Sequence, residues 1–378
     1  MQAARAVVAV FGLAVIIGCD PAPPPRAGAA LGLPALEVPA ENPITREKVA
    51  LGRKLFFDRR LSPNNTMSCA MCHVPEQGFT AHELATPVGM EGRSVRRNAP
   101  TVLNAGFQKR LFHDGREILL EDQVWGPLLA PNEMGNPSIG YVVERIRGLR
   151  DYEGLFQAAF GGKPVSSERI GAALAAYERT LVAGDSRFDR WRFGGDASAL
   201  RDDEKRGFEL FVGKARCAAC HLVGSRDALF TDHGFHNTGI GWRRTYAVPE
   251  RTRVEIAPGV FAELERKTVE SFSEPAPRDV GRYEITLDPA DRWAYKTPSL
   301  RNVALTAPYM HDGSLATLAA VIEFYDRGGI DNPEKSPRLV PLGLNADERA
   351  ALAAFLGSLT GSSVAALVDE ARKTPVGQ

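Results

Sequence analysis

The sequence predicts a mainly α-helical protein that contains two copies of one structural unit, connected by long loops. Apolar residues recur at the helical spacing of three and four in several segments, whereas the alternation typical of strands is scarce. Residues 51–56 (LGRKLF) also resemble residues 206–211 (RGFELF), and residues 100–115 resemble residues 298–313. Similarity between distant segments in the same order indicates an internal duplication.

Composition is that of an ordinary globular protein. The 378 residues are enough for two domains of typical size. Hydrophobic residues make up 44% and charged residues 24%, which is not the composition of a disordered chain. The 46 basic residues equal the 46 acidic ones, so the charge gives no reason to expect a nucleic-acid partner.

The N-terminus predicts export. Arg5 precedes an apolar run over residues 6–17, which is too short to span a bilayer comfortably and is typical of a signal peptide. The run ends at Cys19 in a context that resembles the bacterial lipobox. We therefore expect residues 1–19 to be a lipoprotein signal peptide with lipidation at Cys19; an ordinary cleaved signal peptide and an uncleaved anchor are the alternatives. By resemblance to lipoproteins, Asp20 favours retention at the inner membrane, with the Pro- and Ala-rich residues 20–40 as the tether of a periplasmic protein.

The other four of the five cysteines form two CxxCH motifs, at residues 69–73 (CAMCH) and 217–221 (CAACH). In c-type haem attachment the two thiols bond the vinyl groups of haem, and the adjacent histidine becomes the proximal iron ligand. A zinc site built from two CxxC pairs is the alternative, which the attached histidines and the distance of 148 residues between the motifs disfavour. The motifs predict two covalent haems, attached at Cys69, Cys72, Cys217 and Cys220 and ligated by His73 and His221.

Each haem motif lies in one copy of the repeat. From Pro100 to His113 and from Pro298 to His311 the distance is the same, 13 residues. We expect an N-terminal haem domain over residues 41–195 and a C-terminal haem domain over residues 196–378, with the boundary near Gly194 and Gly195.

Two helices have clear sequence signals. One runs from a Ser166/Ser167 cap to Gly184, with an inward face that includes Ile170 and Leu174. The other begins at Asn345, has Glu348 three residues on as in a capping box, and stops before Gly361. Residues 222–292 lack clear periodicity, and we expect a long irregular excursion there.

The order of motifs resembles the bacterial di-haem cytochrome c peroxidase/MauG superfamily over residues 45–360. Besides the two CxxCH motifs, the resemblance rests on residues 97–101 (RNAPT), 112–116 (FHDGR), 126–127 (GP), 132–134 (NEM) and 296–303 (KTPSLRNV). It implies two cytochrome c-like haem domains and an enzyme that reacts with hydrogen peroxide at the N-terminal haem. In this family, peroxidases that take electrons from a small redox protein carry Met as distal ligand of the second haem. MauG-type enzymes carry Tyr there and oxidise residues of a partner protein.

Tyr325 is the residue that separates these two types. It shares a helical face with Leu318, Val321 and Ile322, so it is expected to point inward. The resemblance makes it the distal ligand of the second haem, whereas a core tyrosine with an ordinary hydrogen bond is the alternative. Met310 is a less favoured ligand, because it aligns with the packing position Phe112 in the other copy.

For the first haem, the resemblance implies an open or water-bound iron, since the loop position where several peroxidases keep a distal histidine holds Met90. Met90 is a less favoured sixth ligand. Glu133 matches the family's distal glutamate, which moves a proton during peroxide cleavage, and Gln123 matches its polar companion. A solvated or helix-capping Glu133 is the alternative.

Two further expectations come from the resemblance. The family places Trp between the haems as an electron relay, and this chain has His113 there, so Trp125, Trp293 or a direct route between propionates would have to replace it; a structural role of His113 is equally open. The family also binds Ca²⁺ between its domains, which would involve the Asn98 side chain and carbonyls near Lys296 and Pro298.

The sequence therefore predicts a di-haem peroxidase that stores oxidising equivalents on a Tyr-ligated second haem and oxidises a periplasmic protein. The alternatives are a peroxidase that takes electrons from a small cytochrome or cupredoxin, and a di-haem electron carrier without enzymatic activity.

Overall fold

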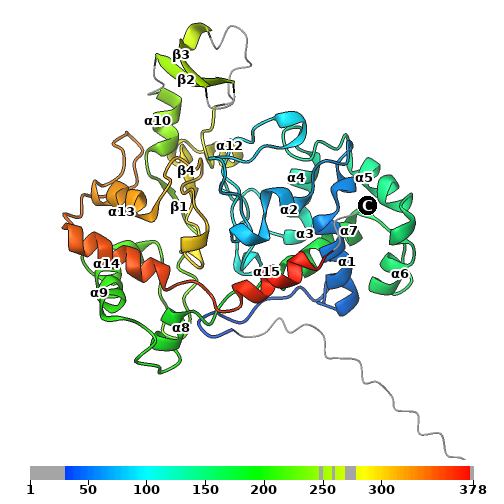
Figure 1. Cartoon of the computed structure of the whole chain (residues 1–378), viewed down its shortest axis with the longest axis horizontal. Coiled ribbons are helices and arrows are strands. Elements are labelled where there is room, and N and C mark those ends of the chain that lie inside the picture. Colours follow the sequence, from blue (N-terminus) through cyan, green and yellow to red (C-terminus); the bar gives the residue numbers. More distant parts are fainter. Residues whose placement is uncertain (1–29, 247–249, 258–259, 269–277, 375–378) are drawn as a thin grey trace, which may run out of the picture.

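The computed structural model describes residues 30–246, 250–257, 260–268 and 278–374. The signal peptide, the lipidation site Cys19 and the first part of the tether lie outside these residues. Helices dominate, and two helical halves lie side by side (Figure 1). In the described part of the chain, no helix has the length and apolarity needed to cross a membrane.

The first half packs its first long helix against its last. Its helices are α1 (Arg46–Phe57), α2 (Cys69–Cys72), α3 (Leu120–Gln123), α4 (Trp125–Leu129), α5 (Ile139–Arg147), α6 (Leu155–Ala159) and α7 (Ser167–Glu178). At the crossing of α1 and α7, an added Cβ on Gly52 would lie 1.9 Å from the Ala173 carbonyl oxygen. Only a glycine permits this close approach of two helices.

The predicted helix over residues 166–184 begins as expected and ends early. The Ser166 side chain accepts a hydrogen bond from the Arg169 amide, as a helix cap does. The helix ends at Glu178, so the expectation that it reaches Gly184 was wrong. The residues after Glu178 bond to Asn104 instead of continuing the helix. The Asn104 backbone amide donates to the Leu181 carbonyl, and the Asn104 side chain donates to the Ala183 carbonyl and accepts from the Ala183 amide.

The second half repeats this arrangement. Its helices are α8 (Arg187–Arg192), α9 (Asp202–Val212), α13 (Leu318–Asp326), α14 (Ala346–Gly357) and α15 (Val364–Arg372). Helix α9 crosses α14 at Gly207, where an added Cβ would lie 2.0 Å from the Ala351 carbonyl oxygen. The predicted capping box of α14 is present, with Asn345 and Glu348 each bonding the other's backbone amide.

The duplication extends to the backbone conformation. Asn104 and Asn302 both have φ of 61°, Phe112 and Met310 have φ of 62° and 72°, and glycines 115 and 313 have φ of 68° and 66°. Non-glycine residues rarely adopt this left-handed region, so matching positions in both copies are unexpected without a common origin. The predicted internal duplication is confirmed.

The excursion over residues 222–292 is more ordered than its sequence suggested. Strand β1 (Phe235–Asn237) pairs antiparallel with β4 (Ala294–Lys296), with Phe235 opposite Lys296. Helix α10 (Ile240–Tyr246) leads to an antiparallel hairpin of β2 (Arg251–Ala257) and β3 (Val260–Glu265), and α12 (Tyr283–Thr286) follows. The hairpin projects from the body at the top of Figure 1. Residues 251–256 (RTRVEI) do alternate as a strand does, so the expectation of an irregular excursion overlooked this signal.

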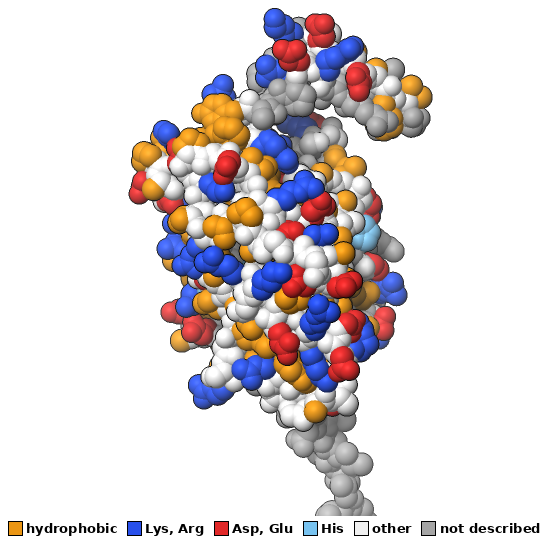
Figure 2. Space-filling model, turned by 90° about the vertical axis from the view of Figure 1, so that its left-hand side faces the viewer, with side chains coloured by type: hydrophobic (Ala, Val, Ile, Leu, Met, Phe, Trp, Pro, Cys, Tyr) orange, Lys and Arg blue, Asp and Glu red, His pale blue; other side chains and the backbone are white. Residues whose placement is uncertain are grey.

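The two larger hydrophobic cores match the two halves, except that α15 of the second half packs on the core of the first. Val364 and Ala371 of α15 pack in the core of the first half, whereas Phe188 of α8 packs in the core of the second. The boundary near residue 195 stays a prediction. On the face that Figure 2 displays, basic and acidic side chains are interspersed, in line with the balanced charge.

Candidate active site

The first CxxCH motif forms the short helix α2 with His73 as its C-cap. The His73 Nδ1 lies 3.3 Å from the Phe79 carbonyl oxygen. Burial lowers the pKa of His73 to about 4, so the ring is neutral. Because a carbonyl can only accept, Nδ1 carries the proton and Nε2 keeps a free lone pair for a metal ion.

The second motif has the same geometry. Its cysteines lie in and just after a 3-10 helix at Cys217–Ala219, and the His221 Nδ1 is 2.8 Å from the Phe230 carbonyl oxygen. Burial lowers the pKa of His221, and it raises the pKa of the Cys217 thiol to about 12. An aromatic ring from the preceding helix faces each histidine, Phe56 in the first copy and Phe211 in the second.

One cavity of about 840 Å³ reaches both motifs, and its wall is mostly apolar. All four motif cysteines are free thiols that could form thioethers. Two thiol pairs, two half-buried histidines with lowered pKa and a mostly apolar cavity fit two covalent haems.

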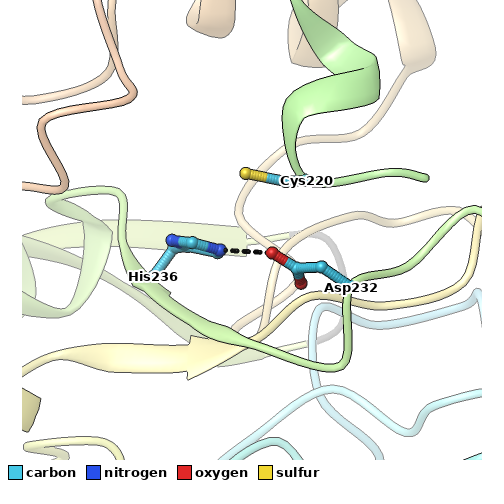
Figure 3. A group of neighbouring side chains, drawn as sticks. All are labelled: Cys220, Asp232 and His236. Carbon is cyan, nitrogen blue, oxygen red and sulfur yellow. Dashed lines mark hydrogen bonds and ion pairs between the residues drawn. The ribbon is translucent and has the colours of Figure 1, made fainter.

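The zinc alternative does not fit the described residues. There, a single group of three metal-type donors lies together: Cys220, Asp232 and His236. Figure 3 shows the hydrogen bond between Asp232 and His236, with the Cys220 sulfur beside them. The Asp232–His236 bond measures 2.9 Å, and interaction with Cys220 and Asp232 raises the pKa of His236. In a CxxCH motif that sulfur is used by haem attachment, which leaves only two donors for a metal ion.

Glu133 and Gln123 both line the cavity, as does the first haem motif. Glu133 lies in a turn after α4 and not at a helix start, so it is not a helix cap. Burial raises the pKa of Glu133, although the positive charge of Arg116 opposes this effect. Among the hydrogen bonds of the described residues, none uses the Glu133 carboxylate. A carboxyl with a raised pKa and no hydrogen-bond partner among the described residues is suited to donating a proton into the cavity.

Tyr325 faces the same cavity, together with Leu318, Val321 and Ile322 on its helix face. It lies near the second haem motif, since Cys220 and Cys217 are close enough to contribute to the shift of its pKa. Burial raises the pKa of Tyr325 above its usual value. No hydrogen bond of its hydroxyl is found in the described part of the chain, whereas the nearby Tyr309 hydroxyl donates to the Val303 carbonyl at 3.0 Å. Met310 also lines the cavity.

The other predicted site residues divide into two groups. His113 lines the cavity, its Nε2 lies 2.9 Å from the Asn98 carbonyl oxygen, and burial lowers its pKa to about 4. Met90, Trp125 and Trp293 are not among the cavity-lining residues. Met90 and Trp125 pack against the first core, and the Trp293 indole donates to the Thr245 hydroxyl. The relay and the Met90 ligand stay predictions.

The predicted calcium ligands lie close together along the cavity. Asn98, Lys296 and Pro298 all line it, and the Asn98 side-chain amide donates to the Ala85 carbonyl. The Pro298 carbonyl also faces the His221 ring. Calcium at this place stays a prediction.

Sequence reasoning missed two features of the cavity wall. Burial raises the pKa of Glu178 at the end of α7 to about 8. Between the halves, the Tyr295 ring stacks on His311, with ring centroids 3.5 Å apart and planes 10° apart. Neither Glu178 nor Tyr295 lies in a sequence motif of the site, because each reaches the cavity only through the fold.

Several known proteins are similar to this chain over most of its length. The family described as "Di-haem cytochrome c peroxidase" matches residues 46–198. The chain is 40% identical to "Methylamine utilization protein MauG" of Methylorubrum extorquens, over 86% of this chain and 82% of that protein. It is 37% identical to "Cytochrome-c peroxidase IdrP1" of Denitromonas iodatirespirans, over 95% of this chain and 93% of that protein.

The chain belongs to the di-haem cytochrome c peroxidase/MauG family. Its fold is similar to that of "a MauG-like protein associated with microbial copper homeostasis", with a TM-score of 0.71 and 36% identity over 88% of this chain and 95% of that one. As a member of this family it is a haem peroxidase that acts on hydrogen peroxide and has two c-type haems. Membership of this enzyme family contradicts the alternative that the protein is a di-haem electron carrier without enzymatic activity.

Proposed function

We propose that this di-haem peroxidase uses hydrogen peroxide to oxidise a partner protein, as expected for the Tyr-containing branch of its family. The observation that carries the proposal is Tyr325, a half-buried tyrosine on the cavity wall near the second haem motif. When bound, haem iron supplies the redox chemistry, and a tyrosinate ligand favours its ferric and higher oxidation states.

The residues of the first half would handle peroxide and its protons. Burial raises the pKa of Glu133 because it disfavours the charged form, so this carboxyl is suited to hold and give up a proton. It would pass this proton to the leaving oxygen of peroxide, while the Gln123 amide orients the bound molecule. The low polarity of the wall excludes water that would compete for the same proton.

We place this reaction in the periplasm, with the protein attached to the inner membrane through lipidated Cys19. The sequence of residues 1–19 and the c-type haem motifs support this location. Lipid labelling of the wild-type chain and of Cys19→Ala tests the anchor: labelling that persists in the variant contradicts it.

The variant Tyr325→Phe tests the function. In the wild-type protein, we expect one equivalent of peroxide to cause a long-lived change in the absorption and EPR spectra. Y325F should lose this change, because the side chain that would bind the haem iron as a phenolate is gone. Tyr309→Phe is the matched control, since Tyr309 lines the same cavity but its hydroxyl already has a backbone partner. Equal spectra for wild type and Y325F contradict the proposal.

A peroxidase that takes electrons from a small cytochrome or cupredoxin is the second candidate. It is favoured by Met310, which lines the same cavity, and by the similarity to proteins named cytochrome-c peroxidase. Steady peroxide turnover with such a donor, lost in Met310→Leu and kept in Y325F, would support it.

A further inference from the structure

A half-buried lysine between the two halves lacks an acidic partner. Lys296 lies on β4 and lines the cavity. Its Nζ donates to the Gln108 side-chain oxygen at 3.2 Å, and no ion pair of Lys296 is present among the described residues. Burial lowers its pKa to about 8, and no carboxylate opposes this effect.

The other cations of the cavity wall are either paired or exposed. The paired ones have carboxylates within 3 Å: Arg96 with Glu284, Arg97 with Asp114 and Asp279, Arg116 with Asp114, and Arg301 with Asp189. The unpaired ones are exposed to solvent: Arg110, Arg216 and Arg338. In the described part of the wall, Lys296 is thus the one cation that is shielded from water and has no carboxylate.

A desolvated ammonium is costly unless an anion lies against it. Lys48 shows the usual solution inside this protein, since its ammonium donates to the Asn42 side chain at 2.9 Å and to the Pro43 carbonyl at 3.1 Å, with Glu121 nearby. Among the described residues, the Lys296 ammonium has one partner, the neutral Gln108 side chain, and no carboxylate nearby. An anion that enters the cavity would supply the missing charge.

Bound haem would bring carboxylates into this cavity, because each haem carries two propionates and both attachment motifs line the cavity together with Lys296. We propose that the Lys296 ammonium anchors a haem propionate at the seam between the two halves. The inference rests on haem binding and not on which protein is oxidised.

The position of Lys296 suits such an anchor. Its backbone amide donates to the His113 carbonyl at 2.7 Å, and its ammonium contacts Gln108, so the residue joins the second half to the first at two points. In the repeat it takes the place of Asn98, a neutral residue whose amide is already bonded to Ala85. At this position of the repeat, the second copy therefore has a positive charge where the first copy has a neutral side chain.

The test compares holoproteins with two attached haems, through potentiometric titration of both haems and resonance Raman bands of their propionates. In Lys296→Gln we expect the reduction potential of one haem to fall, because a nearby cation favours the added electron, and one propionate band to shift. Lys109→Gln is the matched control, since Lys109 is exposed and close by but does not line the cavity. A K296Q protein with the potentials and bands of K109Q overturns the proposal.

Lys296→Arg gives a second test should K296Q not fold. It keeps the charge, so both potentials must stay near those of the wild type while the propionate band changes with the new donor group. An unchanged band overturns the proposal. These measurements use the resting protein without peroxide, so they fail or succeed independently of the Tyr325 experiment.

Discussion

Acidic residues around the cavity have pKa values shifted in opposite directions. Burial raises the pKa of Glu133 and Glu178, neither of which has an ion pair among the described residues. Burial acts in the same direction on Asp114, but the charges of Arg97 and Arg116 outweigh it and lower the pKa of this residue. Burial thus favours the protonated form of both glutamates, and raises the pKa of Glu178 to about 8, whereas the aspartate stays charged.

The Glu133→Gln variant should slow the reaction with peroxide by roughly 10²–10⁴-fold, the range for loss of a general acid–base group. Since the acid form donates the proton, the wild-type rate should fall as the pH rises through the raised pKa of Glu133. Stopped-flow absorption at several pH values measures this, with the exposed Glu153→Gln as control. A variant that keeps the wild-type rate and pH profile would contradict the role of Glu133.

Single residues differ in how far the sequence could predict them. The CxxCH motifs were predictable because covalent attachment fixes their spacing locally. Tyr295, Glu178 and Lys296 were not, since strand pairing and helix crossing bring them to the cavity from distant parts of the chain. In the sequence, Lys296 stands out as the first residue of the motif over residues 296–303 and as a possible carbonyl ligand of calcium, whereas the burial of its ammonium is encoded by no local pattern.

At the scale of elements, each half is held by one pair of crossing helices. The Gly207→Ala substitution should destabilise the second half by roughly 1–3 kcal/mol, because the new methyl group meets the Ala351 carbonyl of α14. Chemical denaturation followed by circular dichroism measures the loss. Gly357→Ala, at the end of α14, is the control: an added Cβ there has no neighbour within 4 Å and should be neutral or stabilising by up to about 1 kcal/mol.

The elements with strong local signals were predicted, and those formed by pairing were not. The starts of α7 and α14 were found from their capping residues, whereas the end of α7 was missed because distant Asn104 decides it. The pairing of β1 with β4 joins residues about 60 positions apart, and three-residue strands carry almost no periodic signal.

At the scale of the whole molecule, a buried ionic network joins the excursion to the first half. Arg97 donates to Asp114 and to Asp279, at 2.6 and 2.7 Å, and Arg282 donates to the Asp114 carbonyl at 2.8 Å. Burial alone would raise the pKa of Asp279, but hydrogen bonds and charge from Arg97 and Arg96 hold it well below its usual value. The charged form of Asp279 thus stabilises the folded protein.

The Asp279→Asn variant should lose roughly 3–5 kcal/mol of stability at neutral pH, since it leaves Arg97 with an incomplete set of partners. A carboxyl with a lowered folded pKa contributes stability above its unfolded pKa, and this contribution disappears as the pH falls towards the folded value. The gap between wild type and D279N should therefore narrow below about pH 4, as measured by denaturation at a series of pH values. The exposed Asp347→Asn serves as control. A gap that stays constant from neutral to acidic pH would mean that the Asp279 charge does not hold the halves together, and that the excursion is fixed by its strand pairing alone.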